Sequence, residues 1–171
     1  ASLWAQAAKV APGKEKLIPL DFTVHNRELT ADIIEDTGRF SVYISGKLDA
    51  AGAKFGIGGY AEHRTVYSRS RVFDAPVPGE EPRRLHLGID IWGKAGTPVF
   101  AFMDSTIHSF AFNDQFGDYG ATIVLQHTIG EISFYTLNGH LSLKDIQSIT
   151  PGANVKKGEC IAHFGIPKEN G

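Results

Sequence analysis

Short runs of strand-forming residues, separated by glycine and other turn residues, fill the chain from residue 85 onward. The runs span residues 85–91, 98–102, 106–112, 121–127, 132–137 and 159–164. Short strands at such regular spacing predict an antiparallel, mainly β core. The 19 glycines and 11 phenylalanines of the chain agree with a β-rich protein that has many tight turns.

The part of the chain that precedes this core has a different pattern. We expect an N-terminal extension of mixed helix and strand over residues 1–74, a proline-rich linker or loop over 75–84, and the β core over 85–171. Within the extension, residues 3–10 predict a short helix and residues 20–24 predict a strand.

Residues 31–54 fit two periodicities, because their apolar residues both recur at helical spacing and alternate as in a strand. Gly38 and Gly46 bracket the run closely, which favours the strand. The next segment is rich in glycine and indicates a turn between strands, at Gly56-Ile57-Gly58-Gly59.

Charge and cysteine content exclude several classes of function. The net charge is −2 and the pI is near 6.4, so we expect no nucleic-acid partner. Cys160 is the single cysteine, which excludes a cysteine-rich zinc ribbon. No stretch approaches the roughly 20 apolar residues of a membrane span, so none is expected. Ala5-Gln6-Ala7 has the form of a signal-peptidase site, but the apolar region that should precede it is missing, and the compartment stays open.

One strand-like segment combines an imidazole and a carboxylate. In residues 85–91, alternation predicts that His86, Gly88 and Asp90 share one face of the strand. The core-facing residues would then be Leu85, Leu87, Ile89 and Ile91. Both donor types bind zinc about 2 Å from the metal. In a straight strand the two residues would lie ~13 Å apart, but Gly88 permits a bend and leaves room for an ion. The competing interpretation is an exposed polar face of an edge strand.

Several landmarks in the order found here resemble those of the lysostaphin-type zinc peptidases, peptidase family M23. The resemblance covers residues 83–168 and is carried by His86-x-Gly88-x-Asp90, Gly96-Thr97-Pro98-Val99, Tyr119-Gly120, the apolar run that ends at His127, His140-Leu141, Pro151-Gly152 and Val155-Lys156-Lys157-Gly158. The resemblance implies an antiparallel β-sheet core of the M23, or duplicated-hybrid-motif, type.

The resemblance also implies a site and a reaction. Zn²⁺ would be the cofactor, His86 and Asp90 would be metal ligands, and His140 would assist catalysis. The expected function is zinc-dependent hydrolysis of a peptide substrate, as in endopeptidases that cut peptidoglycan in the bacterial periplasm or outside the cell. Asn138 stands where the family usually has tyrosine, which puts any role of that tyrosine in doubt. The dipeptide Asn138-Gly139 predicts a hairpin turn that would present the His140 imidazole at a strand end.

Three further residues are expected to line the cleft or to support the ligands. The segment Gly59-Tyr60-x-Glu62-x-Arg64-x-x-Tyr67 resembles one that precedes the core in a subset of the family, so Arg64 and Tyr67 are candidates. A strand face with a surface arginine explains them equally well. His127 matches a family position near the cleft.

The family's third ligand comes from a His-x-His motif, and no such motif occurs in the 171 residues. Either the chain is incomplete at its C-terminus, which we expect, or the domain is degenerate. Two other classes therefore stay open, namely a catalytically inactive binding domain and a phosphotransferase IIA or biotinyl-type carrier domain. Asp90 beside His86 argues against the IIA domain, which would pair two histidines.

Overall fold

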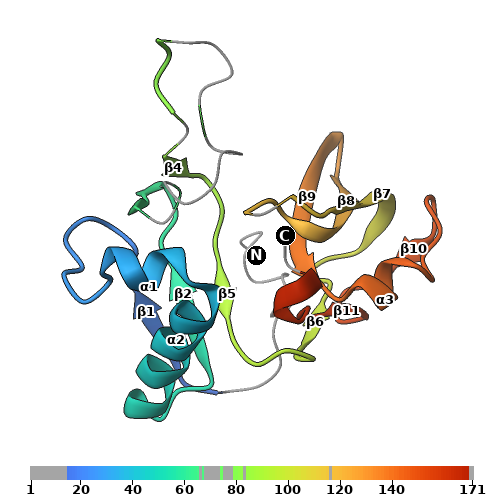
Figure 1. The fold of residues 1–171 in the computed structure, drawn as a ribbon. Helices are drawn as coiled ribbons and strands as arrows, with labels where there is room; N and C mark the ends of the chain where they lie inside the picture. Colours follow the sequence, from blue (N-terminus) through green and yellow to red (C-terminus); the bar gives the residue numbers. More distant parts are fainter. Residues whose placement is uncertain are drawn as a thin grey trace. The chain divides into compact units, whose positions relative to one another are not determined.

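The computed structural model describes residues 15–65, 67, 74, 79–82, 84–115 and 117–169. The chain divides into two compact units, of which the N-terminal one spans residues 15–93 and the described part of the C-terminal one spans 94–169 (Figure 1). Each unit is described by itself. The short helix expected over residues 3–10 lies outside the described residues, as do residues 75–78 and 83 of the expected linker.

The N-terminal unit is built on a strand–helix–strand arrangement. The strands β1 (Leu17–Leu20) and β2 (Phe55–Gly58) are parallel, and the helices α1 (Ala31–Glu35) and α2 (Thr37–Ala51) connect them. Parallel neighbours need such a crossover because a tight turn cannot join them. The helices lie on one face of this sheet (Figure 1). The predicted strand over 20–24 is wrong in its bounds, since β1 ends at Leu20.

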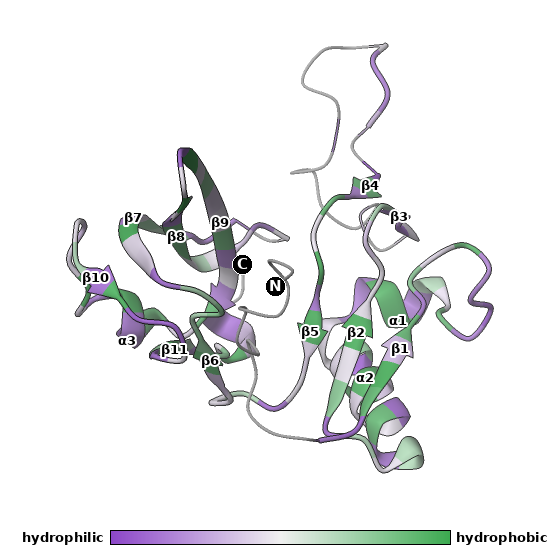
Figure 2. Ribbon diagram, turned by 180° about the vertical axis from the view of Figure 1, so that it is seen from behind, coloured by the Kyte–Doolittle hydropathy of each residue, from purple (hydrophilic) through white to green (hydrophobic). Residues whose placement is uncertain are grey.

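Two short strands from the region after residue 84 belong to the same unit. The strand β5 (Ile91–Trp92) pairs antiparallel with β2, and β4 (Leu85–His86) pairs antiparallel with β3 (Glu62–His63). The glycine-rich segment at residues 56–59 is therefore not the predicted turn, because Gly56 and Gly58 lie inside β2. Along β2, hydrophobic residues alternate with these glycines (Figure 2).

The predicted strand within residues 31–54 is also wrong, because this segment forms α2. The Asp36 side chain accepts a hydrogen bond from Arg39 N at 2.8 Å and caps the first turn. Gly52 ends the helix in the left-handed conformation that glycine favours. Every fourth residue from Phe40 is buried against the sheet, so the helical periodicity is the one that the fold uses.

Aromatic side chains form the centre of this unit's core. Phe22, Phe40 and Trp92 contact one another with ring centroids 5.4 to 5.9 Å apart. Trp92 comes from β5, so a residue from beyond the expected linker completes the core of the N-terminal unit.

The regular secondary structure of the C-terminal unit is mainly antiparallel β, which confirms the predicted mainly β core. One sheet has the order β10-β7-β8-β9 and a second pairs β11 with β6. The bounds are β6 (Pro98–Phe100), β7 (Ser105–Asn113), β8 (Gly120–Ile129), β9 (Ile132–Leu141), α3 (Leu143–Ile146), β10 (Asn154–Val155), β11 (Cys160–His163) and the 3₁₀ helix η4 (Pro167–Glu169). Its core includes Ala121, Ile123 and Leu125 of β8, all essentially buried.

Within the part of the chain that the structure describes, no helix is both long enough and apolar enough to cross a bilayer.

Candidate metal-binding site

The structure brings His86 and Asp90 together. His86 Nε2 lies 3.5 Å from Asp90 Oδ1, although four residues of an extended strand would span ~13 Å. The segment between β4 and β5 is not a strand, and the chain bends at Gly88. A Cβ at residue 88 would lie 3.0 Å from His86 Nε2, so only glycine leaves the imidazole its present position without a close contact.

The bend changes which side chains are exposed. Leu85, Leu87 and Ile89 were expected to face the core, but they are 53, 64 and 62% exposed. The side chains of His86 and Asp90 are 15 and 26% exposed. The expectation fails because alternation applies to a continuous strand, and this segment leaves the strand after His86.

Arg64 holds the second oxygen of Asp90. Its Nη1 forms a hydrogen-bonded ion pair with Asp90 Oδ2, and its Nε donates to Glu62 Oε2 at 2.8 Å. Arg64 is only 3% exposed. Burial by itself lowers the pKa of Arg64, but the charge of Asp90 and the hydrogen bonds to Asp90 and Glu62 raise it above its ordinary value. The guanidinium is therefore a fixed cation between two carboxylates.

Tyr67 is the second expected cleft residue, and it lies next to His86 and Arg64. Its ring is edge-on to the His86 imidazole, with centroids 6.0 Å apart, and the Arg64 guanidinium lies 5.9 Å from its centre. Sequence reasoning missed Glu62, which pairs with His86 across β3 and β4. The alternation of Glu62 with Arg64 could have pointed to it, because residues two apart share a strand face.

His140 lies in the C-terminal unit, at the end of β9. Its φ of +57° is uncommon for a residue other than glycine. His140 N donates to Tyr119 O at 2.7 Å, and Gly165 N donates to His140 O at 3.0 Å. These two hydrogen bonds hold the unusual backbone, while the side chain is exposed.

The hairpin turn predicted at Asn138-Gly139 is wrong. Both residues lie inside β9, opposite a register shift between Ala121 and Ile123 of β8, and the turn between the strands is at Gly130. The register shift is the local irregularity that accompanies the unusual backbone of His140.

His127 is fully buried in the C-terminal unit. Its Nδ1 lies 3.2 Å from Asp104 O, its Nε2 lies 2.9 Å from Thr136 Oγ1, and its ring stacks on Phe134. Burial lowers the pKa of His127, and the hydrogen bond with Asp104 opposes that effect only in part. With both ring nitrogens engaged, this is the arrangement of a histidine that supports the core.

The donor atoms of His86 and Asp90 fit one zinc ion. In tetrahedral coordination with bonds of 2.0 to 2.2 Å, two ligand atoms lie about 3.4 Å apart, and the observed separation is 3.5 Å. His86 Nδ1 is buried without a hydrogen-bond partner among the described residues, so the imidazole is not fully hydrogen-bonded within the fold. Across the described ranges, no three His, Cys, Asp or Glu side chains gather as a set that could hold a metal ion.

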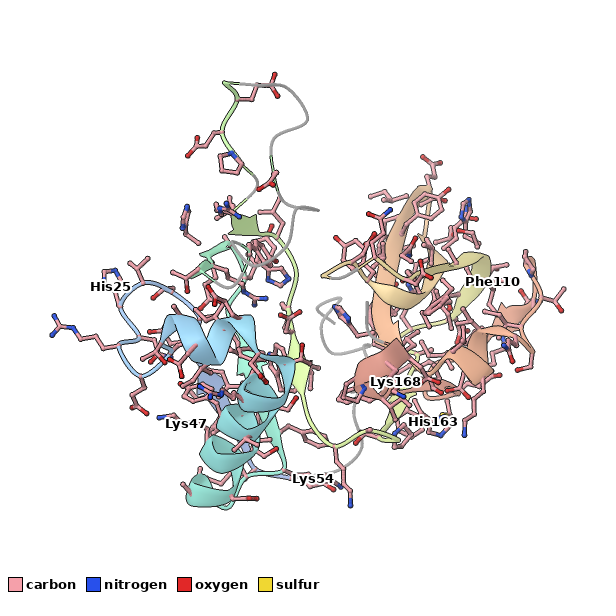
Figure 3. The ribbon with its side chains drawn as sticks, viewed as in Figure 1. His25, Lys47, Lys54, Phe110, His163 and Lys168 are labelled. Atoms are coloured by element: carbon pink, nitrogen blue, oxygen red, sulfur yellow. The ribbon has the colours of Figure 1, made fainter. Side chains whose placement is uncertain are left out.

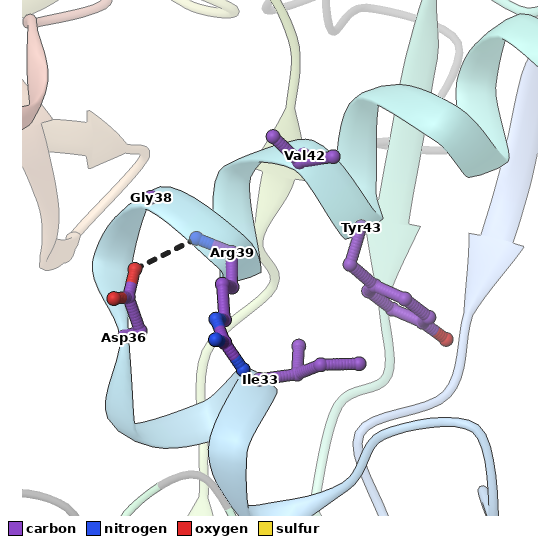
Figure 4. A pocket seen from close by; sticks show the side chains of 6 residues that line it. All are labelled: Ile33, Asp36, Gly38, Arg39, Val42 and Tyr43. Carbon is purple, nitrogen blue, oxygen red and sulfur yellow. Dashed lines mark hydrogen bonds between the residues drawn. The ribbon is translucent and has the colours of Figure 1, made fainter.

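Two other features do not resemble an active site. An open hollow of about 520 Å³ beside α1 and α2 contains one carboxylate, Asp36, which caps α2; the hollow is lined by Ile33, Asp36, Gly38, Arg39, Val42 and Tyr43 (Figure 4). His163 lies on the C-terminal unit (Figure 3), where its Nδ1 is 3.0 Å from Asp145 Oδ2.

Comparison with known proteins identifies the family. The family model described as peptidase family M23 matches residues 84–171, which is about half of the chain and includes His86, Asp90 and His140. Neither curated proteins nor solved structures gave a match. The chain belongs to peptidase family M23.

Proposed function

We propose that the protein is a zinc-dependent endopeptidase that cuts peptide cross-links of the peptidoglycan type. One observation carries the proposal: His86 Nε2 and Asp90 Oδ1 approach to 3.5 Å, the separation of two ligands on one tetrahedral ion. Family membership supports hydrolysis of peptide bonds as the reaction class.

His86 and Asp90 would hold the metal. His86 would supply a neutral imidazole lone pair from Nε2, and Asp90 would supply a negative charge from Oδ1. When bound, zinc supplies a Lewis acid that polarises the scissile carbonyl and lowers the pKa of water. Asp90 would bind through a single oxygen, because Arg64 holds the other one.

His140 would move a proton. One ring nitrogen of its imidazole can accept a proton from the attacking water and later donate it to the leaving amine nitrogen. The positive φ of His140 supports a functional role, because such backbone strain tends to occur at functional sites.

Metal analysis of single variants tests the ligands. We expect about one zinc per chain in the full-length protein and a clear loss of zinc in His86→Ala and Asp90→Ala. His25→Ala is the matched control, because His25 lies in the same unit on an exposed loop (Figure 3) and should bind zinc as the wild type does. Unchanged zinc content in both ligand variants would refute the assignment.

Hydrolysis of glycine-containing peptides tests His140. We expect His140→Ala to retain zinc and to lose hydrolysis, whereas His108→Ala, which alters an exposed histidine of the same unit, retains both. Loss of zinc in His140→Ala would show that the division of roles is wrong. A protein that keeps its fold but neither binds zinc nor cleaves peptides would be a metal-free binding domain of the same family.

A further inference from the structure

We infer that Arg64 is a positioning residue for the zinc-binding carboxylate of Asp90, and that Glu62 in turn fixes Arg64. The inference rests on the proposed function and extends it to residues that lie outside the family match, which begins at residue 84. The N-terminal extension would thus supply part of the metal site.

Arg64 bridges two carboxylates with two different nitrogen atoms. Nη1 binds Asp90 Oδ2 and Nε binds Glu62 Oε2, and the Glu62 side chain is itself only 10% exposed. Glu62 Oε1 also accepts a hydrogen bond from Phe22 N at 3.2 Å. Because a planar guanidinium presents its donors in a rigid fork, this chain of contacts fixes the rotation of the Asp90 carboxylate.

Backbone hydrogen bonds and packing around Arg64 also hold Asp90 in position. Gly58 N donates to Asp90 O at 2.9 Å, and Arg64 N donates to Arg84 O at 2.9 Å, so the extension holds the metal motif at both ends. The guanidinium lies over the Phe22 ring, 5.3 Å from its centre. A Cβ at residue 58 would lie 2.6 Å from Arg64 Nη2, so the absence of a side chain at Gly58 makes room for the guanidinium.

The bridge assigns different tasks to the two oxygens of Asp90. Oδ2 is held by Arg64, which leaves Oδ1 directed at His86 Nε2. Without the guanidinium, two poorly solvated carboxylates would repel each other and Asp90 would be free to rotate. Groups that orient a metal ligand in this way change metal affinity by about 10- to 100-fold when they are mutated.

Positioning and simple electrostatics predict opposite results. A cation beside a zinc site repels the ion, so removing its charge alone should tighten zinc binding. If Arg64 orients Asp90, its removal should weaken zinc binding despite the lost repulsion. Arg64→Lys keeps the charge but cannot hold both carboxylates in one fork, so it should weaken binding as well.

The test is the affinity of the full-length protein for Zn²⁺ alone, measured by competition with a chromophoric chelator. We expect about 10-fold weaker binding in Arg64→Lys and up to about 100-fold in Arg64→Met. Arg39→Lys is the matched control, because it changes an exposed Arg–Asp pair of the same unit and should leave the affinity unchanged. Circular dichroism and thermal unfolding in chelator establish that each variant is folded.

A second variant leaves Arg64 in place and therefore serves if Arg64→Met does not fold. Gly58→Ala should displace the guanidinium and weaken zinc binding, whereas Gly46→Ala, which meets open space on α2, should not. Zinc binding that is unchanged or tighter in the folded Arg64 and Gly58 variants, while His86→Ala and Asp90→Ala lose zinc, would overturn this inference alone. If His86→Ala and Asp90→Ala bind zinc as the wild type does, the metal assignment itself fails, and the inference fails with it.

Discussion

Gly88→Ala should separate zinc binding from folding. The added Cβ would lie 3.0 Å from His86 Nε2 and 3.2 Å from Cε1. Ordinary van der Waals contacts of a Cβ begin at 3.4 Å, so the imidazole must move by a few tenths of an ångström. Zinc–ligand distances tolerate only about 0.2 Å. We therefore expect zinc affinity to fall about 10- to 100-fold, the range found when the groups that orient a metal ligand are mutated.

The same substitution should leave the fold intact. The φ of Gly88 lies outside the left-handed region, so alanine can adopt this backbone. Replacing glycine by alanine without strain stabilises proteins by about 0.4–1 kcal/mol, through a lower entropy of the unfolded chain. At residue 88 this gain opposes the cost of displacing the imidazole. Chelator competition measures the affinity, urea unfolding of the metal-free protein measures the stability, and Gly46→Ala is the control. A Gly88→Ala protein that binds zinc as tightly as the wild type would refute the reasoning.

Two further predictions concern stability. Burial lowers the pKa of His127, so below pH ~6.5 the unfolded chain binds a proton that the folded chain does not, and folding stability should decrease as the pH falls, by at most about 1.4 kcal/mol per unit. Urea unfolding at pH 7 and pH 5 should show a smaller decrease in His127→Phe; an equal decrease would assign the effect to other groups. Asp36→Ala should cost about 1 kcal/mol, because it removes the cap of α2. Asp49→Ala, at the opposite end of the same helix, should be neutral or stabilising, since a negative charge there opposes the helix dipole; equal losses in both variants would contradict the capping role.

Local pattern was sufficient for most of the C-terminal unit. The runs at 106–112, 121–127 and 132–137 each lie within a strand that is two to four residues longer than the run. Each of these strands pairs with a strand that is adjacent to it in the sequence. The local alternation and the turns between the runs are therefore sufficient to predict this part of the sheet. Asn138-Gly139 misled because tertiary pairing overrides the turn preference of a dipeptide.

The local sequence pattern was insufficient where contacts with other parts of the chain determine the structure. Gly38 and Gly46 favour a strand in the local pattern, but the segment forms α2 because the helical spacing of Phe40, Ile44 and Leu48 buries one face in a core. Trp92, which packs against that core, lies about 40 residues farther along the chain. The types and spacing of His86 and Asp90 were visible in the sequence, but the bridge from Arg64 to Asp90 joins residues 26 positions apart, and nothing in the local pattern pairs them.

The pairing of β5 with β2 has a practical consequence for anyone who dissects this protein. The family match begins at residue 84, inside the compact N-terminal unit, and that unit extends to residue 93. A fragment that begins at residue 84 would lack Phe22 and Phe40, which pack against Trp92. It would also lack β2, so the edge of β5 would be unpaired, and unpaired strand edges promote self-association. Chimeras with other members of the family should therefore exchange residues 15–93 as one piece.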